Sequence, residues 1–572
     1  MVKGVTKKKA KKPKLTAAER ARAKLQNDHR SDIRGIFTGS GFRRMSGIAD
    51  KQFTFDGQTA DVDDIFIFEN LIVVAEYTCT KSSEIGSHLK PKKIIFDKIL
   101  ADPNAFTDFI SNTFPDCAGQ FPIGYHKSQT KLKIVYCSRF DFDSHYKTNV
   151  PGPIYFDYSA VRYFKDLVAA IKRSSRYEII QFLKIQLSDI GKNGKINVSD
   201  GSQDYPGLIL PEAHSNFKDG HKIVSFYTDP EALLRTAYVL RKDGWRESPT
   251  LYQRRISKTK IDRIRAYLKR EERVFVNNII VTLPPDVKPL NPDKTTVHPS
   301  KLNDTAPVLI RLPDRANSVG VIDGQHRIFA YHETRDDDAK IAKLRQQQNL
   351  LVTGIIFPEG FTPAEQEHFE AKLFLEINDN QTKVLPNIRQ AIQVVLEPYS
   401  VVSIAARVLS GLSKFGPLSG EIQQYYFDTN KLKTGSIVNY GLASLVKTSG
   451  TDSLFSIWSH AEKEGVVSAT NATALEEYIS FCVSTINLVL AAIRKNIPAE
   501  RWTTERKVEG RVLSTVAVNS FLIVTRMLVE KNVLLTEQAL GLAFKGIADF
   551  DFGEFRSSQY ARMAEKIIKT HF

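Results

Sequence analysis

Residues 60–80 read ADVDDIFIFENLIVVAEYTCT, two runs of apolar and β-branched residues joined by Glu69-Asn70. Such runs favour β-strands, and a two-residue connection is typical of a tight hairpin. Because both runs are apolar, we expect both strands to be buried in a central sheet. Counting outward from this turn, the chain pairs Asp63 with Glu76 across the two strands. The stretch therefore predicts an α/β domain built around this hairpin.

Two carboxylates are expected to face each other at the open end of the hairpin. Directly opposed residues have Cβ atoms about 4.5–5.5 Å apart. At that distance Asp63 and Glu76 repel unless a cation lies between them, and Mg²⁺ prefers carboxylate and water oxygens. Thr78 shares the face of Glu76, with Asp61 opposite it. The alternative is a surface hairpin whose acidic end points into water, which the apolar runs on both sides disfavour.

This pattern resembles the PD-(D/E)XK nuclease superfamily, in which an Asp and a Glu bind Mg²⁺ and a Lys two residues after the Glu helps to activate water. The predicted order of helix, strands, helix and strand also fits, over roughly residues 30–140. The resemblance implies a metal site at Asp63 and Glu76. In this sequence Thr78 occupies the position of the Lys. The missing charge is expected from Lys81, or from Lys90, Lys92 or Lys93 at the start of the next helix.

A second motif lies at residues 318–332, SVGVIDGQHRIFAYH, where a β-branched run passes into a helical pattern. Gly324 permits a tight turn and a close approach to a ligand. Asp323 can cap the helix, and the free N–H groups at its start can bind an anion. Arg327 can grip phosphate oxygens, and His326 can act as a proton donor or acceptor. The alternative is purely structural, with Asp323 as a cap and Arg327 in an ion pair.

The string Asp323-Gly324-Gln325-His326-Arg327 resembles the signature of the DGQHR-domain family, which includes DndB-type proteins associated with DNA phosphorothioate modification. That family is similar to ParB/sulfiredoxin-like domains, which bind a nucleoside triphosphate at the same strand-to-helix turn. Tyr252-Gln253-Arg254 and the segment Phe374–Asn378 match further family features, so the resemblance covers residues 222–572. The implied site contains Gln253, Arg254, Asp323, Gly324, Gln325, His326, Arg327, Asn378, Gln381 and Lys383. No Walker-type GxxxxGK[ST] loop is present, so nucleotide binding would be of another kind.

The pattern along the chain predicts an α/β multidomain protein. We expect a basic disordered arm at 1–16, a PD-(D/E)XK-like α/β domain at 17–150 and a helical connector with a loop at 151–221. A ParB-like α+β DGQHR domain at 222–390 and a helical C-terminal part at 391–572 follow. Helices are expected at 17–36, 92–114, 163–185, 230–241, 258–270 and 363–378. Strands are expected at 131–138, 222–227, 277–283, 318–322 and 350–357, with a loop at 191–220.

Composition and charge restrict the class of protein. The chain has 572 residues and a formal net charge of +16, part of it in the arm Lys7–Lys14. This arm is either a solvated tail or a segment that contacts phosphates. The four cysteines show no ligand spacing, which fits a reduced cytoplasmic protein without a disulfide framework or a structural zinc site. The N-terminus lacks a secretory signal and the apolar stretches are short or contain polar residues, so we expect no membrane association.

Together these features predict a DNA-binding protein of the DGQHR type, linked to DNA modification or phage defence. Its cofactors would be Mg²⁺ and a nucleoside triphosphate, and its partner DNA, with Mg²⁺-dependent nuclease activity as the enzymatic interpretation. The alternatives are a non-enzymatic DNA-binding transcriptional regulator and a nucleotide-binding or nucleotide-hydrolysing ParB-like switch.

Overall fold

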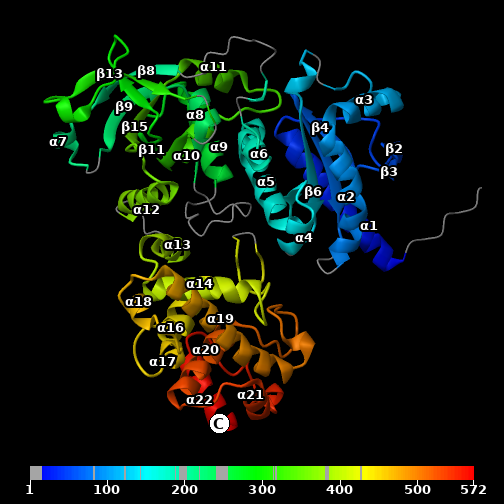
Figure 1. Ribbon diagram of the computed structural model, residues 1–572, viewed down its shortest axis with the longest axis vertical. Coiled ribbons are helices and arrows are strands. Elements are labelled where there is room, and N and C mark those ends of the chain that lie inside the picture. The colour runs from blue at the N-terminus through cyan, green and yellow to red at the C-terminus, as the bar shows by residue number, and fades with distance from the viewer. Residues whose placement is uncertain are drawn as a thin grey trace, which may run out of the picture. The chain divides into compact units, whose positions relative to one another are not determined.

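Two mixed β-sheets and a helical region form this α/β protein (Figure 1). The computed structural model describes residues 16–80, 84–121, 124–141, 144–186, 189–191, 203–217, 220–239, 256–313, 315, 318–379, 386–425 and 428–572. The chain divides into two compact units. The first contains both sheets and extends to Tyr238, with Ile256–Ile356 added; the second contains Phe357–Phe572. The predicted α/β multidomain class is confirmed at this level.

The first sheet has five strands in the order β1-β4-β5-β6-β7. These are β1 Arg43–Arg44, β4 Asp64–Phe68, β5 Leu71–Thr78, β6 Lys131–Ser138 and β7 Ile154–Phe156. The predicted hairpin is confirmed, because β4 and β5 are antiparallel with Phe68 opposite Leu71. Strands β5, β6 and β7 are parallel to one another. A separate two-stranded hairpin joins β2 Phe53–Phe55 to β3 Gln58–Ala60.

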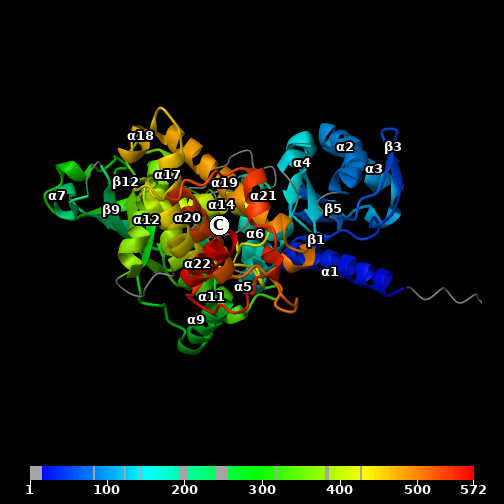
Figure 2. The same cartoon turned by 90° about the horizontal axis from the view of Figure 1, so that it is seen from below.

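Helices α1 and α2 lie on opposite sides of this sheet (Figure 2). Helix α1, Ala17–Gly39, begins at the predicted capping box, in which Thr16 and Glu19 bond each other's backbone N–H. Near its C-terminal end, Phe37 stacks on Phe66 of β4, with the ring centroids 4.6 Å apart. Helix α2, Ile85–Ala101, packs its apolar side chains in one core with the other face of the sheet.

Two predicted helices of this region are interrupted. The helix expected at 92–114 is two helices, α2 and α3 Pro103–Thr113, because Asp102 caps a new helix that begins at Pro103. The helix expected at 163–185 is divided into α5, Tyr158–Ile171, and α6, Arg176–Phe182. Lys172, between them, has a φ of 48° that helical backbone does not adopt. A short helix, α4 Ser144–Asn149, precedes β7.

The second sheet has eight strands in the order β10-β14-β11-β15-β9-β8-β13-β12. Their bounds are β8 Gln203–Ile209, β9 Lys222–Thr228, β10 Ala237–Tyr238, β11 Ile279–Leu283, β12 Lys288–Leu290, β13 Ala306–Leu312, β14 Val319–Asp323 and β15 Leu350–Ile356. The loop predicted at 191–220 is wrong for its described part, which contains β8 and helix α7, Glu212–Ser215. Because β8 pairs with β9, the boundary predicted at 221/222 falls inside this sheet.

Four helices accompany the second sheet: α8 Pro230–Thr236, α9 Lys258–Glu271, α10 Gln325–Phe329 and α11 Ala339–Gln347. The helix predicted at 230–241 ends early, because Ala237 and Tyr238 pair with β14 as a strand. The predicted helix 258–270 is confirmed. The two sheets belong to one unit and meet through Arg176 of α6, whose guanidinium lies 2.8 Å from the Glu333 carboxylate.

The second unit is helical, as predicted from residue 386 onward. Its main helices are α12 Pro363–Asp379, α13 Pro386–Leu396, α14 Val401–Lys414, α19 Ala472–Lys495, α20 Thr515–Glu530, α21 Glu537–Ala543 and α22 Tyr560–His571. Shorter helices are α15 Thr434–Ser436, a π-helix at Ile437–Leu442, α16 Ala443–Val446, α17 Leu454–Ile457 and α18 Lys463–Val467. Among the described helices, α19 alone has the length and apolar composition of a single membrane span, and its buried side chains belong to the core of this unit. Residues 388–414 would qualify only as a bent pair.

Candidate functional site

The open end of the β4–β5 hairpin carries the predicted carboxylates. The strand ladder ends at the pair Asp64–Ala75, one residue short of the predicted pair Asp63–Glu76. The backbone N–H of Asp63 still donates to Ala75, at 3.2 Å. Its carboxylate accepts the backbone N–H of Tyr77 at 2.7 Å. Asp63 therefore lies beside the end of β5 instead of directly across from Glu76.

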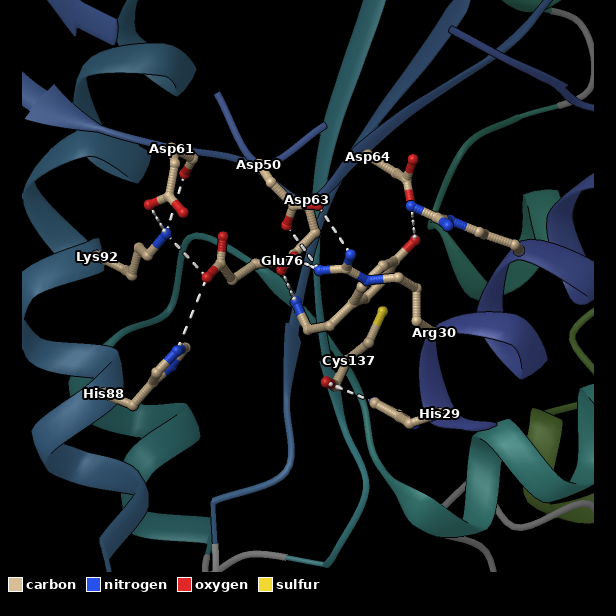
Figure 3. A network of polar contacts seen from close by, with 12 residues as sticks. His29, Arg30, Asp50, Asp61, Asp63, Asp64, Glu76, His88, Lys92 and Cys137 are labelled. Atoms are coloured by element: carbon tan, nitrogen blue, oxygen red, sulfur yellow. Dashed lines mark hydrogen bonds and ion pairs between the residues drawn. The ribbon is translucent and has the colours of Figure 1, made fainter. Parts of the chain in front are cut away.

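Glu76 contacts a lysine of helix α2 (Figure 3). Lys92 Nζ lies 2.8 Å from Glu76 Oε1 and 2.8 Å from Asp61 Oδ1. His88, one helical turn earlier, has its Nε2 3.8 Å from the same Glu76 oxygen. Of the three candidate lysines that the structure describes, Lys90, Lys92 and Lys93, Lys92 is the one that lies at the carboxylates.

The other expected lysines lie elsewhere. Lys93 pairs with Asp97 one turn along the helix, at 2.6 Å, and Lys90 is exposed. Lys81 lies outside the described residues. Thr78, in the position of the superfamily lysine, is buried and donates its hydroxyl to Thr80 at 2.9 Å. Thr78 supplies no charge at this end of β5, so the charge comes from α2.

A second cation reaches the site from helix α1. Arg30 places one guanidinium nitrogen 2.8 Å from Asp63 and 2.7 Å from Asp50. Together with Lys92, this makes four carboxylates, namely Asp50, Asp61, Asp63 and Glu76, that share two cations. With every carboxylate ionised, the cluster keeps two uncompensated negative charges.

Glu76 is the most buried of the four carboxylates in this cluster. Its side chain is only 5% exposed, and its Oε2 has no hydrogen-bond partner. Burial raises the pKa of Glu76 from 4.5 to about 8, although the nearby Lys92 acts to lower it. Burial also raises the pKa of Asp63, against the bond from Tyr77 and the charge of Arg30. Both shifts arise first from burial, which disfavours the ionised carboxylate more than the nearby cations favour it.

Lys92 remains a cation in this surrounding. Burial acts to lower its pKa, but the neighbouring Glu76 and Asp61 together raise it above the ordinary value. A lysine in this state donates hydrogen bonds and offsets negative charge, and it does not act as a base near neutral pH. His88 is the opposite case, because burial and the charge of Lys92 lower its pKa.

Asp64, next to Asp63 in sequence, has a structural role between helix α1 and the sheet. It is fully buried and is bound by Arg34 of α1 at 2.7 Å, by Arg44 of β1, and by the Tyr77 hydroxyl at 2.9 Å. With its two oxygens held by three donors, Asp64 ties α1 to the sheet. The acidic residues at 61–64 therefore divide between two helices: Asp61 pairs with α2, and Asp63 and Asp64 pair with α1.

The carboxylates of the first sheet suit a magnesium ion in charge and in ligand type. Within the described ranges, no group of three or more His, Cys, Asp or Glu side chains is arranged as a complete metal site. Mg²⁺ is commonly bound by only one or two carboxylates, with waters and substrate phosphates as its other ligands. The uncompensated charge and the unpartnered Glu76 Oε2 fit such an ion. Glu76 and Asp63 would hold it, with Asp61 at the exposed edge.

The second motif forms the predicted strand-to-helix turn, but its contacts are internal. Gly324 adopts a φ of 104° between β14 and α10, and it, not Asp323, is the residue that precedes the helix. Arg327 donates to Asp323 at 2.9 Å and to the Asn278 carbonyl at 2.7 Å. The predicted cap is therefore wrong, and the geometry matches the alternative in which Arg327 forms an ion pair. Helix α10 has five residues, too few for a strong anion site at its start.

Other predicted residues of this second site are only partly described. His326 Nε2 accepts the backbone N–H of Ser257 at 3.0 Å, and Gln325 lies beside it at the helix start. Asn378 belongs to the second unit, where its amide donates to the Phe374 carbonyl at 2.9 Å. Gln253, Arg254, Gln381 and Lys383 lie outside the described residues. Among the predicted residues that the structure describes, Asp323 to Arg327 form one turn of the first unit.

Sequence reasoning missed Arg30, Asp50 and His88. Arg30 and Asp50 are 20 residues apart and meet only because α1 packs on the sheet. The sequence feature that could have indicated Arg30 is the basic face of α1, which carries Arg30 and Arg34 one turn apart. His88 and Lys92 are also one turn apart on α2, a spacing that places both on one helix face.

Comparison of the chain with protein-family models, with curated proteins and with solved structures gives no match.

Proposed function

We propose that the first sheet is a Mg²⁺-dependent phosphodiesterase site that cleaves DNA, with Glu76 and Asp63 on the metal side and Lys92 as the positively charged group. The observation that carries this proposal is the position of Lys92, 2.8 Å from Glu76 and from Asp61. It supplies from a neighbouring helix the charge that Thr78 does not supply. A surface hairpin with solvated acids has no need of a half-buried lysine between them.

Each residue has a defined part in this chemistry. A bound Mg²⁺ would polarise the phosphate and lower the pKa of a bound water. Lys92 would offset the negative charge that develops on the phosphate, because its own pKa is raised and it stays protonated. Arg30 holds the Asp63 carboxylate at 2.8 Å and so fixes its direction. Glu76 keeps one oxygen on Lys92 and leaves the other free.

DNA is the proposed substrate because the whole chain is strongly basic, with a net charge of +16. A chain that binds phosphates through Lys and Arg releases counterions, so log affinity should fall steeply with log salt concentration. A flat salt dependence would contradict phosphate contacts. A variant without residues 2–15 should show a shallower slope if the basic arm takes part in binding.

The decisive experiment is cleavage of supercoiled plasmid in Mg²⁺ or Mn²⁺. Lys92→Met should reduce the rate at least about 100-fold, since one electrostatic donor in a buried site is worth that much in catalysis. Lys93→Met is the matched control, because it removes the adjacent lysine of the same helix, which pairs with Asp97. Asp63→Asn should be as inactive as Lys92→Met.

Equal rates for wild type, Lys92→Met and Asp63→Asn would reject the nuclease. In that case a non-enzymatic DNA-binding regulator becomes the better proposal. Thr78, which replaces the lysine of the nuclease motif, favours it.

The DGQHR motif supports a second proposal: a DNA- or nucleotide-binding turn in a protein of DNA modification or phage defence. The supporting observation is that Arg327 Nε and Asn278 Oδ1 are buried beside the turn without hydrogen-bond partners. Binding of labelled nucleoside triphosphates by wild type and by Arg327→Ala tests it. If the wild type binds no nucleoside triphosphate, the proposal of a nucleotide-binding turn is rejected.

A further inference from the structure

A basic cavity lies in the helical second unit, apart from both motifs of the first. Its volume is about 280 Å³, at the lower edge of the range for small-ligand pockets. Two parts of the chain line it, the first with Gln423 and residues 428–433 and the second with residues 504–515, which end at the start of helix α20. Four basic residues, Lys431, Lys433, Arg506 and Arg511, belong to its wall.

The four cations differ in how they are held. Arg511 donates to the backbone carbonyls of Thr504 and Leu513, at 3.1 and 3.3 Å, so its guanidinium is fixed in the wall. Lys433 and Arg506 are exposed and have no ion-pair partner in the part of the chain that the structure describes. Lys431 lies 3.7 Å from Glu421, which offsets part of its charge.

The one acidic residue in the wall, Asp428, does not neutralise these cations. Its carboxylate accepts the backbone N–H groups of Gln424 and Tyr425, at 2.9 and 2.8 Å. The lining residues therefore carry three net positive charges. Helix α20 is 16 residues long and starts here, with Ser514 capping Ala517, so its first N–H groups add positive potential to the same wall.

We propose that this cavity binds a terminal phosphate or diphosphate group, held by Lys433, Arg506 and the fixed guanidinium of Arg511. Phosphate oxygens match a guanidinium fork and an ammonium group, and charge-assisted bonds of this kind are the strong ones. A cavity of this size takes a small phosphorylated molecule or the phosphorylated end of a strand, not a double helix. The two sources, a free nucleotide and a strand end, present the same chemistry.

Calorimetric titration of the full-length protein with inorganic pyrophosphate, without divalent metal, tests the proposal. Lys433→Ala/Arg506→Ala should bind pyrophosphate at least about tenfold more weakly than wild type, because two charge-assisted contacts are lost. Lys545→Ala/Lys569→Ala is the matched control, since both lysines are exposed in the same unit and away from the cavity, and the charge change is equal. The control should bind like wild type.

No binding of pyrophosphate to the wild type, or an equal loss in both double variants, would overturn the proposal. If Lys433→Ala/Arg506→Ala unfolds, pyrophosphate binding is measured instead with the charge-preserving variant Lys433→Arg/Arg506→Lys. Retained binding by this variant supports the site. A variant that folds like wild type but does not bind pyrophosphate rejects it. Displacement of pyrophosphate by a 5′-phosphorylated but not a 5′-hydroxyl oligonucleotide identifies a strand end, and displacement by a nucleoside triphosphate alone identifies a nucleotide. Glu76→Gln should leave this binding unchanged, so the result is independent of the proposed nuclease.

Discussion

Replacing Glu76 by Gln should stabilise the protein while it removes the proposed activity. In the folded protein burial raises the pKa of Glu76 to about 8, from 4.5. The unfolded chain therefore loses the Glu76 proton at a lower pH than the folded chain does. The contribution of Glu76 to the stability of the wild type is therefore complete below pH 4.5 and is lost as the pH rises toward 8. Gln is neutral throughout, and Lys92 keeps Asp61 as a partner at 2.8 Å.

The size of this effect follows from the shift itself. Each unit of pKa corresponds to about 1.4 kcal/mol, so Glu76→Gln should be more stable than wild type by roughly 3 kcal/mol at pH 7 and roughly 5 kcal/mol above pH 8. The difference should vanish near pH 4. Mg²⁺ should reduce it at pH 8, because a cation beside Glu76 stabilises the ionised carboxylate.

Hydrogen exchange of peptides from β5, measured over a urea series at several pH values, is the suitable assay. A protein with two compact units need not unfold in one step, so a local probe is better than a global signal. Glu76→Gln less stable than wild type at pH 8, or a difference that does not change with pH, would refute the reasoning. A gain in stability together with lost cleavage is the pattern expected of a functional carboxylate.

Asp64→Asn should lower the free energy of unfolding by about 3 kcal/mol, because it removes one partner of a buried ion pair. An unchanged midpoint of urea unfolding would contradict this structural role of Asp64. Protonation of His332 should cost roughly 3 kcal/mol of stability between pH 6.5 and pH 4, measured in the Glu76→Gln background so that Glu76 does not offset it, because burial lowers the pKa of His332 to about 4 and the unfolded chain gains the proton first. His332→Gln should flatten that loss, and parallel pH profiles would speak against it. Arg327→Ala and Asp323→Ala should show a coupling of about 1 kcal/mol in a double-mutant cycle of unfolding, whereas zero coupling would leave Arg327 free for a ligand.

Local sequence was sufficient for the elements whose geometry depends on neighbours in the chain. The Glu69-Asn70 turn sets the hairpin register, because a two-residue connection allows one way of pairing the two strands that it joins. The capping box at Thr16 and Glu19 likewise marks the start of α1 within a single turn. The helical second unit follows from the apolar periodicity of the C-terminal part.

Contacts between distant residues were decided by the tertiary structure alone. The sequence offered Lys90, Lys92 and Lys93 of α2 on equal terms, and the rotation of α2 on the sheet is what brings Lys92 to Glu76. The partner of Arg327 and the pairing of β8 with β9 and β13 also depend on packing across long loops.

The sequence by itself therefore determined the β4–β5 hairpin and its acidic end, the strands β6, β9, β11, β14 and β15, and the starts of α1, α8, α9 and α12, since these follow from periodicity and turn chemistry within a few residues. Tertiary structure decided which charges meet. It joined Arg30, Asp63 and Asp50, and it placed residues 428–433 against 504–515 to form the basic cavity. The reason is physical: side chains reach only a few ångströms, so their partners are fixed by how whole elements pack.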